Sequence, residues 1–342
     1  MRKPWFGAGV ALLVVSVAAP LGASPAAPRF HAPVVMPGSD GGSEPSVAIS
    51  KSGVRYVTWQ SPGQFASSLD GVHFTALATP DPDANGDTSD AVDAAGAVYD
   101  AQICGSATSL HTCIYRSTDA GHHWTLQSNL ADNHPGASDR PWIDVFPKST
   151  AGSWNTDNTT VYLEYHTFSP EDLAYVTVSH DGGRTFSTPA FITSDPNALD
   201  SSFCNTVPSG IVADQKRPGT LYALWLSGND SQANASSGCN YSQIGPFNKA
   251  WVSTSVDDGT TWTSHLAWHG AFDATTKVGD NANKIFGTIG VDLAGQIHVV
   301  VPARHLDDPT TFAATGTESP QPTNLLLASS PDRGAHWTQP VT

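Results

Sequence analysis

The stretch "STDAGHHW" (Ser117–Trp124) has the frame Ser-x-Asp-x-Gly-x-x-aromatic, and this frame occurs four times in the chain. The other copies are "SHDGGRTF" from Ser179, "SVDDGTTW" from Ser255 and "SPDRGAHW" from Ser330. A shortened copy, "SLDGVHF", begins at Ser68. Recurrence of one phrase at a spacing of tens of residues indicates an array of one supersecondary unit. We call each copy a box and expect one structural module per box.

A second phrase comes before every box and reads as an apolar strand, a turn with Gly or Asp, and a second strand. Its five copies are "EPSVAISKSGVRYVTW", "TSDAVDAAGAVYDAQ", "RPWIDVFP…TTVYLEYH", "SGIVADQKRPGTLYALW" and "GTIGVDLAGQIHVVV". A third strand follows ("TCIYRS", "LAYVTVS", "KAWVSTS" or "LLLASS" in the last four copies), then the box and a short fourth strand. Five modules of four strands predict an all-β fold, a β-propeller with five four-stranded blades.

The boxes have a structural explanation. The box aspartate can accept backbone N–H bonds in the turn between the third and fourth strands. The box glycine supplies a backbone conformation that bulkier residues avoid, and the aromatic ring is expected to pack back into the sheet. The four full boxes contribute Asp119, Asp181, Asp257 and Asp332 in this structural role. The boxes therefore predict the fold and not the chemistry.

These boxes resemble the Asp-box (BNR) repeats of the sialidase superfamily. The resemblance covers nearly all of residues 40–342 and implies a sialidase-like propeller over that range, with the boxes on the rim away from the active site. Propellers of that family usually have six blades, whereas five modules are present here. A six-bladed plan with the last blade missing from this sequence is one expectation, with "HAPVVMP" along a free edge. A closed five-bladed ring is the other.

The first residues have the layout of a secretory signal. Arg2 and Lys3 precede an apolar run from Phe6 to Ala19, which is short for a membrane span, and small residues follow. We expect a signal peptide over residues 1–23, a linker or closing strand over 24–39, and a secreted, cell-surface or periplasmic propeller. A retained membrane anchor is the alternative for the leader, and no span is expected in the mature chain.

Composition narrows the class of partner. Charged residues make up 14% of the chain, Gly and Pro number 30 and 25, and the net charge is −15. Nucleic acids are disfavoured because phosphate binding needs clustered Lys and Arg, and a strongly anionic polymer fits poorly for the same reason. Carbohydrate or protein ligands remain.

The four cysteines predict disulfides in an exported protein. The favoured pairs are Cys104–Cys113 across a hairpin and Cys204–Cys239 around a longer loop. Three connectivities are open, and free structural thiols are the alternative.

The sialidase resemblance also implies a catalytic set that the sequence meets only in part. That family holds a substrate carboxylate with three arginines and uses a Tyr nucleophile with a Glu and an Asp. No Arg-Ile-Pro tripeptide is present, and no Tyr follows Tyr241. Whether the chain is an enzyme stays open on the sequence. The favoured function is binding of glycan or protein at the channel face; an exo-alpha-sialidase or related glycoside hydrolase is the alternative.

Ligand-binding residues are expected where the innermost strands open at the channel mouth. Alignment of the turn glycines places Glu44 opposite Asp87, and the apolar frame places Arg140 at the equivalent point of the third module. The candidate ligand-binding residues are Glu44, Asp87, Asp139, Arg140, Trp142 and Arg304. The alternative for the Arg–Asp pair is a structural tie between neighbouring blades.

One acidic turn has the spacing of a calcium loop. "DPDANGD" aligns Asp81, Asp83, Asn85 and Asp87 as oxygen ligands, but Val92 stands where an EF-hand would carry Glu. Asp87, Asp90 or Asp93 could substitute for that Glu in a non-helical site. This sequence fits a solvated acidic turn better than a structural calcium site, and both interpretations stay open. No other cofactor is expected.

Overall fold

The computed structural model describes residues 32–40, 42–60, 64–83, 86–106, 109–134, 136–150, 152–167, 173–193, 206–228, 247–273, 278–282, 287–306 and 324–342. The chain forms two units, Met1–Val34 and Val35–Thr342, and the second contains every described strand. Apart from strands, that unit has one 3-10 turn, Thr156–Asn158, among the described residues. Within the described ranges, no helix is long and apolar enough to cross a membrane.

The strands form five separate antiparallel sheets, which we number as blades in chain order. Blade 1 contains β1 (Ser43–Ile49), β2 (Arg55–Gln60), β3 (Gln64–Ser68) and β4 (Thr75–Ala76). Blade 2 contains β5 (Thr88–Val92), β6 (Val98–Ser106), β7 (Ser109–Ser117) and β8 (Thr125–Ser128). Blade 3 contains β9 (Ser138–Phe146), β10 (Thr160–Thr167), β11 (Ala174–Ser179) and β12 (Ala190–Phe191). Blade 4 contains β13 (Thr206–Ala213), β14 (Leu221–Gly228), β15 (Phe247–Ser255) and β16 (Thr263–His269).

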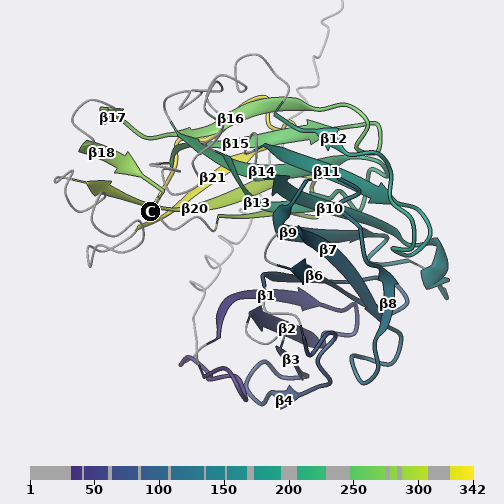
Figure 1. Ribbon diagram of the computed structural model, residues 1–342. Coiled ribbons are helices and arrows are strands. Elements are labelled where there is room, and N and C mark those ends of the chain that lie inside the picture. The colour runs from purple at the N-terminus through teal and green to yellow at the C-terminus, as the bar shows by residue number, and fades with distance from the viewer. Residues whose placement is uncertain are drawn as a thin grey trace, which may run out of the picture. The chain divides into compact units, whose positions relative to one another are not determined.

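Blade 5 contains β19 (Thr288–Val291), β20 (Ile297–Leu306) and β21 (Asn324–Ser330), with β17 (Phe272–Asp273) and β18 (Val278–Asn281) extending one end of β20. Val341 bridges to Leu327 at the position where the other blades carry a fourth strand. The predicted five modules are therefore confirmed as a five-bladed β-propeller. In Figure 1, blade 1 lies at the bottom, blades 2 and 3 at the right, and blade 5 at the left.

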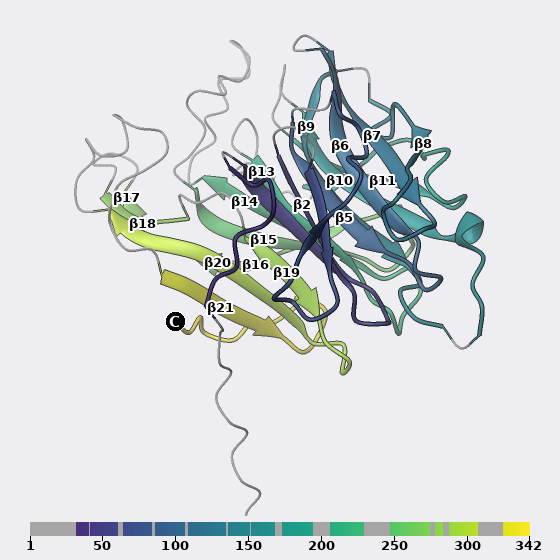
Figure 2. The same cartoon turned by 90° about the horizontal axis from the view of Figure 1, so that it is seen from below.

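The innermost strands pack on one another in chain order, β1 on β5, β5 on β9, β9 on β13 and β13 on β19. Figure 2 shows the same blades from below. An apolar cluster fills each of the four joints between consecutive blades. Because neighbours cover both of its faces, β14 ("LYALWLSG") is buried along its whole length and reads as a near-continuous apolar run.

Each full box forms the same turn. In the first of them, the Ser117 hydroxyl donates to Asp119 Oδ1 at 2.8 Å and accepts from the Gly121 amide at 2.8 Å. The amide of His123 donates to Asp119 Oδ1 at 2.9 Å. The box glycines have φ between 82° and 92°, in the left-handed region that favours glycine. The expected roles of the box aspartate and glycine are confirmed.

The expectation that the box ring packs into its own sheet is incomplete. The ring packs at the joint between its own blade and the preceding blade. Trp124 of blade 2 meets Phe65 of blade 1 edge-on at 4.9 Å between ring centroids. A Cβ added at Gly121 would lie 3.0 Å from the same Phe65 ring. The rings of the later boxes join the clusters between blades 2 and 3, 3 and 4, and 4 and 5 in turn (Phe186, Trp262, Trp337). The boxes thus fasten each blade to the one before it.

Blade 1 and blade 5 each expose apolar side chains on the face that has no consecutive neighbour. Val47 and Ile49 of β1 are each 62% exposed, whereas Ala48 between them is buried against blade 2. On blade 5, Leu325 is 64% exposed. Among the described residues, β1 and β19 show no packing comparable to that of consecutive inner strands. Residues 32–37 form no strand, so no described pairing of this segment with the chain's last residues closes the ring.

One predicted disulfide is confirmed. Cys104 and Cys113 are bonded across the β6–β7 hairpin with their Cα atoms 5.8 Å apart, inside the range for an unstrained bridge. The predicted partners Cys204 and Cys239, like the leader over residues 1–23, lie outside the described residues.

Candidate functional site at the channel mouth

Two inner strands begin with the same unusual backbone. Glu44 before Pro45 and Arg140 before Pro141 have φ of 53° and 55°, a region that non-glycine residues seldom adopt. Both residues lie where the strand register is irregular. Glu44 falls in the shift between Ser43 and Ser46 of β1. Arg140 of β9 lies opposite the shift between Glu164 and His166 of β10. Such bulges re-aim side chains, and strained residues of this kind cluster at functional sites. Here they turn Glu44 and Arg140 toward each other.

Arg140 is the centre of the resulting cluster. It is 5% exposed, and its Nη1 lies 3.0 Å from Glu44 Oε2 and 3.5 Å from Asp87 Oδ2. Its guanidinium carbon lies 4.5 Å from the centre of the Trp142 ring. The Arg140 amide donates to Asp139 Oδ1 at 2.7 Å. We call these five residues, Glu44, Asp87, Asp139, Arg140 and Trp142, the mouth cluster.

The structure therefore brings together five of the six residues that the sequence analysis singled out for ligand binding. It also shows the structural tie that was the alternative, because Arg140 of blade 3 pairs with carboxylates of blade 1 and of the segment leading into blade 2. The sixth residue, Arg304, is buried on β20 of blade 5, in register with Asn281 of β18.

The mouth cluster holds more acidic than basic groups, and this changes their protonation. Burial, followed by a hydrogen bond with Asp87 and the Asp87 charge, raises the pKa of Glu44 to about 8, although Arg140 lowers it. Burial and the charge of Asp87 raise the pKa of Asp139 to about 6, with His166 acting in the opposite direction. A carboxyl group that keeps its proton near neutral pH can donate a hydrogen bond or act as an acid.

The described part of the predicted calcium loop does not converge on one point. Asp81 Oδ2 accepts from the Tyr115 hydroxyl at 2.7 Å, and Asp81 Oδ1 accepts from the Asp83 amide at 3.0 Å. Asp87 instead faces Arg140, and Asn85 lies outside the described residues. Across the residues that the structure describes, no group of three His, Cys, Asp or Glu side chains could hold a metal ion.

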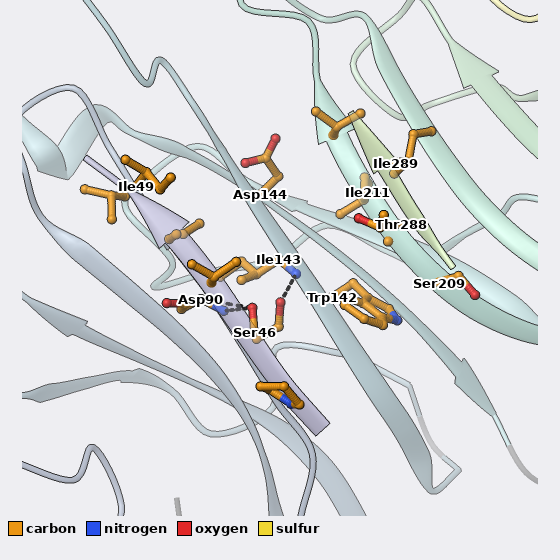
Figure 3. A pocket seen from close by; sticks show the side chains of 18 of the residues that line it. Ser46, Ile49, Asp90, Trp142, Ile143, Asp144, Ser209, Ile211, Thr288 and Ile289 are labelled. Atoms are coloured by element: carbon orange, nitrogen blue, oxygen red, sulfur yellow. Dashed lines mark hydrogen bonds between the residues drawn. The ribbon is translucent and has the colours of Figure 1, made fainter. Parts of the chain in front are cut away.

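A cavity of about 540 Å³ runs along the inner strands of all five blades. We call it the axial cavity. Its apolar lining includes Ile49, Ile143, Ile211 and Ile289, one from each of four different inner strands. Trp142 also lines it and donates from Nε1 to the Pro208 carbonyl at 3.1 Å. Because Trp142 also stacks on Arg140, it connects the mouth cluster to the axial cavity. Figure 3 shows the Trp142 indole among the side chains that line the cavity.

Two acidic residues that line the axial cavity were not predicted to bind a ligand there: Asp144 was missed, and Asp90 was considered only as a calcium ligand. Asp90 accepts at Oδ1 from the Ser46 hydroxyl of blade 1 at 2.6 Å. Asp144 accepts at Oδ2 from the Ala213 amide of blade 4 at 2.8 Å and pairs at Oδ1 with Lys148. The available signal was a lone Asp followed by apolar residues in a predicted inner strand, in "TSDAV" and "RPWIDVF". An acid at such a position is expected to serve a joint between blades or a ligand.

No family model matches the sequence, and no curated protein matches it. Solved structures of propeller glycoside hydrolases do match. The GH93 alpha-L-arabinofuranosidase of Fusarium graminearum, in complex with arabinobiose, superposes with a TM-score of 0.50 at 11% identity over 89% of this chain and 84% of that chain. An alpha-L-arabinanase of Penicillium chrysogenum complexed with arabinobiose follows at 0.49 and 12%, over 86% and 80%. A thermostable family-43 glycoside hydrolase follows at 0.47 and 11%, over 84% and 89%. At this identity the likeness to the Fusarium enzyme shows a shared propeller fold and no more.

Proposed function

We propose that this chain is an exported, carbohydrate-binding propeller that takes its ligand at the mouth cluster. The observation that carries the proposal is the convergence of Glu44, Asp87, Asp139 and Arg140 beside the Trp142 ring at the entrance of the axial cavity. Carboxylates and a guanidinium give hydrogen bonds of fixed direction, and an indole face packs on the C–H face of a sugar ring. Ligand sites commonly combine a largely apolar cavity with a few such convergent polar groups.

The charge balance and the fold support a carbohydrate over the other ligand classes. A net charge of −15 opposes nucleic acid. The structurally similar Fusarium enzyme is a glycoside hydrolase solved with arabinobiose, so a fold of this kind can carry a saccharide ligand. Transfer of that ligand class to the present chain is part of the proposal.

Hydrolysis is the second candidate function, as an exo-alpha-sialidase or a related glycoside hydrolase. The observation that favours it is the pair Glu44 and Asp87, which share a hydrogen bond while burial raises the pKa of Glu44 to about 8. A carboxyl group that keeps its proton near neutral pH, beside a second carboxyl group, is a common arrangement for the proton donor of glycoside hydrolysis. In this candidate Glu44 would be the proton donor.

The sialidase-like type, the six-bladed plan and export belong to the same proposal. Four regular box turns and the exposed apolar faces of blades 1 and 5 support the first two. The basic and apolar leader supports export.

The test is isothermal titration of the mature protein with a panel of neutral, acidic and amino disaccharides, beside a turnover assay with fluorogenic glycosides that include a sialoside. We expect Trp142→Ala to weaken saccharide binding at least tenfold. The matched control, Trp154→Ala, removes an indole whose Nε1 hydrogen-bonds Thr159 away from the mouth cluster, and should leave binding within twofold. Binding that is equal in both variants would place the ligand elsewhere.

The two candidate functions separate in the turnover assay. Turnover of a glycoside that is abolished in Glu44→Gln, with binding retained, would establish the hydrolase and defeat the binding-only function. Binding without turnover of any glycoside would support the binding function.

A further inference from the structure

Three side chains beside the β6–β7 hairpin form a chain of hydrogen bonds from a surface hydroxyl to a buried carboxylate. Ser109 and His111 are two positions apart on β7, so both side chains project from the same face of the strand. The Oγ atom of Ser109 lies 3.1 Å from Nε2 of His111. Nδ1 of His111 lies 3.1 Å from Oδ2 of Asp132, in the segment between blades 2 and 3. Hydroxyl, imidazole and carboxylate thus follow one another in the order of a nucleophile, its general base and the group that orients the base.

The burial of the carboxylate distinguishes this arrangement from the other histidine–aspartate pairs within the described ranges. The Asp132 side chain is 0% exposed and that of His111 is 23% exposed. In the other pairs the aspartate side chain is between 37% and 53% exposed. His180 and His298 also contact a hydroxyl, but their carboxylates belong to this exposed group. Exposed pairs hold their geometry weakly because water competes with them, so the buried carboxylate orients its imidazole best.

Asp132 is held in place by contacts from blades 2 and 3. The Ser138 hydroxyl donates to Asp132 Oδ2 at 2.6 Å, and the Tyr165 hydroxyl donates to the Asp132 carbonyl at 2.7 Å. The preceding amide, of Ala131, donates to the Thr112 carbonyl of β7 at 2.9 Å. The carboxylate is therefore fixed relative to the strand that carries the hydroxyl and the imidazole. Reactive groups need supporting contacts of this kind to keep a productive geometry.

The hairpin itself is also fixed, although the hydroxyl at its end is open to solvent. The Cys104–Cys113 disulfide joins β6 to β7, and Cys104 is the register partner of His111. Both strands contact β9 of the next blade (Figure 1). Ser109 is exposed and does not line the axial cavity. A substrate can therefore reach this hydroxyl from the surface, and the open position suits a short acyl group.

The hydrogen bonds define where the protons lie. A carboxylate only accepts, so a neutral His111 carries its proton on Nδ1 and donates it to Asp132. The lone pair of Nε2 then accepts the hydroxyl proton of Ser109. This is the arrangement in which an imidazole can take the proton of a serine that attacks an electrophile.

We infer that Ser109, His111 and Asp132 form a second site, distinct from the mouth cluster, that hydrolyses small acyl esters such as acetyl esters. Ser109 Oγ bonds to the ester carbonyl carbon while His111 Nε2 takes the hydroxyl proton. The bond from that carbon to the alcohol oxygen then breaks, and His111 returns the proton to the leaving alcohol. Water repeats both steps on the acyl-serine, which releases the carboxylic acid and restores the hydroxyl. Asp132 holds the imidazole and stabilises its positive charge between the two proton transfers.

Labelling with a biotin-linked fluorophosphonate tests the nucleophile directly, because an activated serine oxygen displaces fluoride from phosphorus. Mass spectrometry of the labelled peptides locates the modified residue. We expect Ser109 to be labelled in the unmodified protein, and the labelling rate to fall about a hundredfold in His111→Gln, the size expected for loss of a general base. Ser106→Ala removes another exposed serine, the register partner of Ser109 on the same hairpin, and should leave the rate within about twofold.

Two further measurements address turnover and the carboxylate. The unmodified protein should hydrolyse p-nitrophenyl acetate, and Ser109→Ala should abolish this turnover while Ser106→Ala retains it. A low-field proton resonance from the Nδ1–H of His111 should be present in the unmodified protein and in Ser109→Ala, and absent in Asp132→Asn. A purely structural role of Asp132 would leave that resonance unchanged, which would overturn its assignment as the group that positions the imidazole.

Each remaining outcome bears on the serine site alone. Absence of label on Ser109 in the unmodified protein would overturn the inference, and this result needs no variant, so a folding defect cannot conceal it. Equal labelling in His111→Gln would show that the imidazole does not activate the serine. Turnover that persists in Ser109→Ala would assign the attack to another group. None of these results touches the proposed carbohydrate function, which the saccharide titrations with Trp142→Ala test separately.

Discussion

The joint between blades 4 and 5 and the joint between blades 1 and 2 use different chemistry for the same task. The former is an extended apolar cluster that includes Leu224, Val252, Val299 and Ala328. The latter has a smaller apolar cluster, with Ala48 in it, and places buried carboxyl groups beside it. Asp90 and Asp100 lie in its interior, and Glu44 and Asp87 lie at its mouth.

The contrast between an apolar joint and a joint with buried carboxyl groups indicates different roles for the two joints of one repeated fold. Apolar burial stabilises without direction, so the blade 4–5 joint can be large and chemically inert. Buried acids lower stability unless they are neutralised or hydrogen-bonded, so a joint that keeps several of them is a candidate for a ligand-binding role. The proposed ligand site at the mouth cluster lies on the side of the molecule around blades 1 to 3.

The largest expected effect is a core truncation in the apolar joint. Leu224 is fully buried in the cluster between blades 4 and 5. We expect Leu224→Ala to lower the free energy of unfolding by about 2–5 kcal/mol, since it removes buried methyl groups and leaves a cavity. Val47→Ala on the open face of blade 1, where Val47 is 62% exposed, should change it by less than about 0.5 kcal/mol. Urea unfolding measures both, and a large loss in the Val47 variant would mean that this face is covered.

The next effect concerns pH and the acids at the blade 1–2 joint. The pKa of Asp90 is raised from 3.8 to about 7, so between these values the unfolded chain loses a proton that the native state keeps. Stability therefore falls as pH rises from about 4 to about 7 and levels off above that, a change on the order of 3 kcal/mol from this one group. Glu44, with its pKa raised to about 8, extends the fall to slightly higher pH.

Asp90→Asn removes the titrating group at that joint and keeps the contact with Ser46. The variant should show a flatter profile of unfolding free energy between pH 4 and 8 than the unmodified protein. Asp292→Asn serves as a comparison, because the pKa of Asp292 is lowered by backbone hydrogen bonds in a turn of blade 5. A slope that does not change in Asp90→Asn would show that the carboxyl of Asp90 is ionised in the native state.

The smallest expected effect separates the two roles of a box glycine. Gly121 and Gly53 have similar φ, 89° and 85°, but a Cβ at Gly121 would lie 2.9 Å from Leu77 and 3.0 Å from Phe65, whereas Gly53 has nothing within 4 Å. Gly53→Ala should lower unfolding free energy by about 1 kcal/mol, the cost of a left-handed backbone for a residue with Cβ. Gly121→Ala should lower it by about 1 kcal/mol more, because overpacking at the joint is added. Equal losses would show that the box does not fasten blade 2 to blade 1.

Much of the fold could be read from the sequence because its signals are local and repeated. The Ser-x-Asp-x-Gly frame makes its hydrogen bonds within the turn that it forms, from Ser117 to the Gly121 amide and from Asp119 to the His123 amide. The Cys104–Cys113 bridge closes a hairpin whose strands were already apparent. Position along the inner strands also predicted six residues for one mouth, and five of them lie together there (Glu44, Asp87, Asp139, Arg140 and Trp142). The sixth, Arg304, lies on β20.

The sequence alone determined the number of modules and the chemistry of each turn, because both depend on residues that are close along the chain. Only the tertiary structure decided that Trp124 packs on Phe65 of the blade before it, and that Asp90 accepts from Ser46. The pairing of Arg140 with Glu44 required it too, since it depends on two strained residues 96 positions apart. These contacts join residues of different blades, and their geometry follows from how consecutive sheets pack around the axis, which no single module encodes.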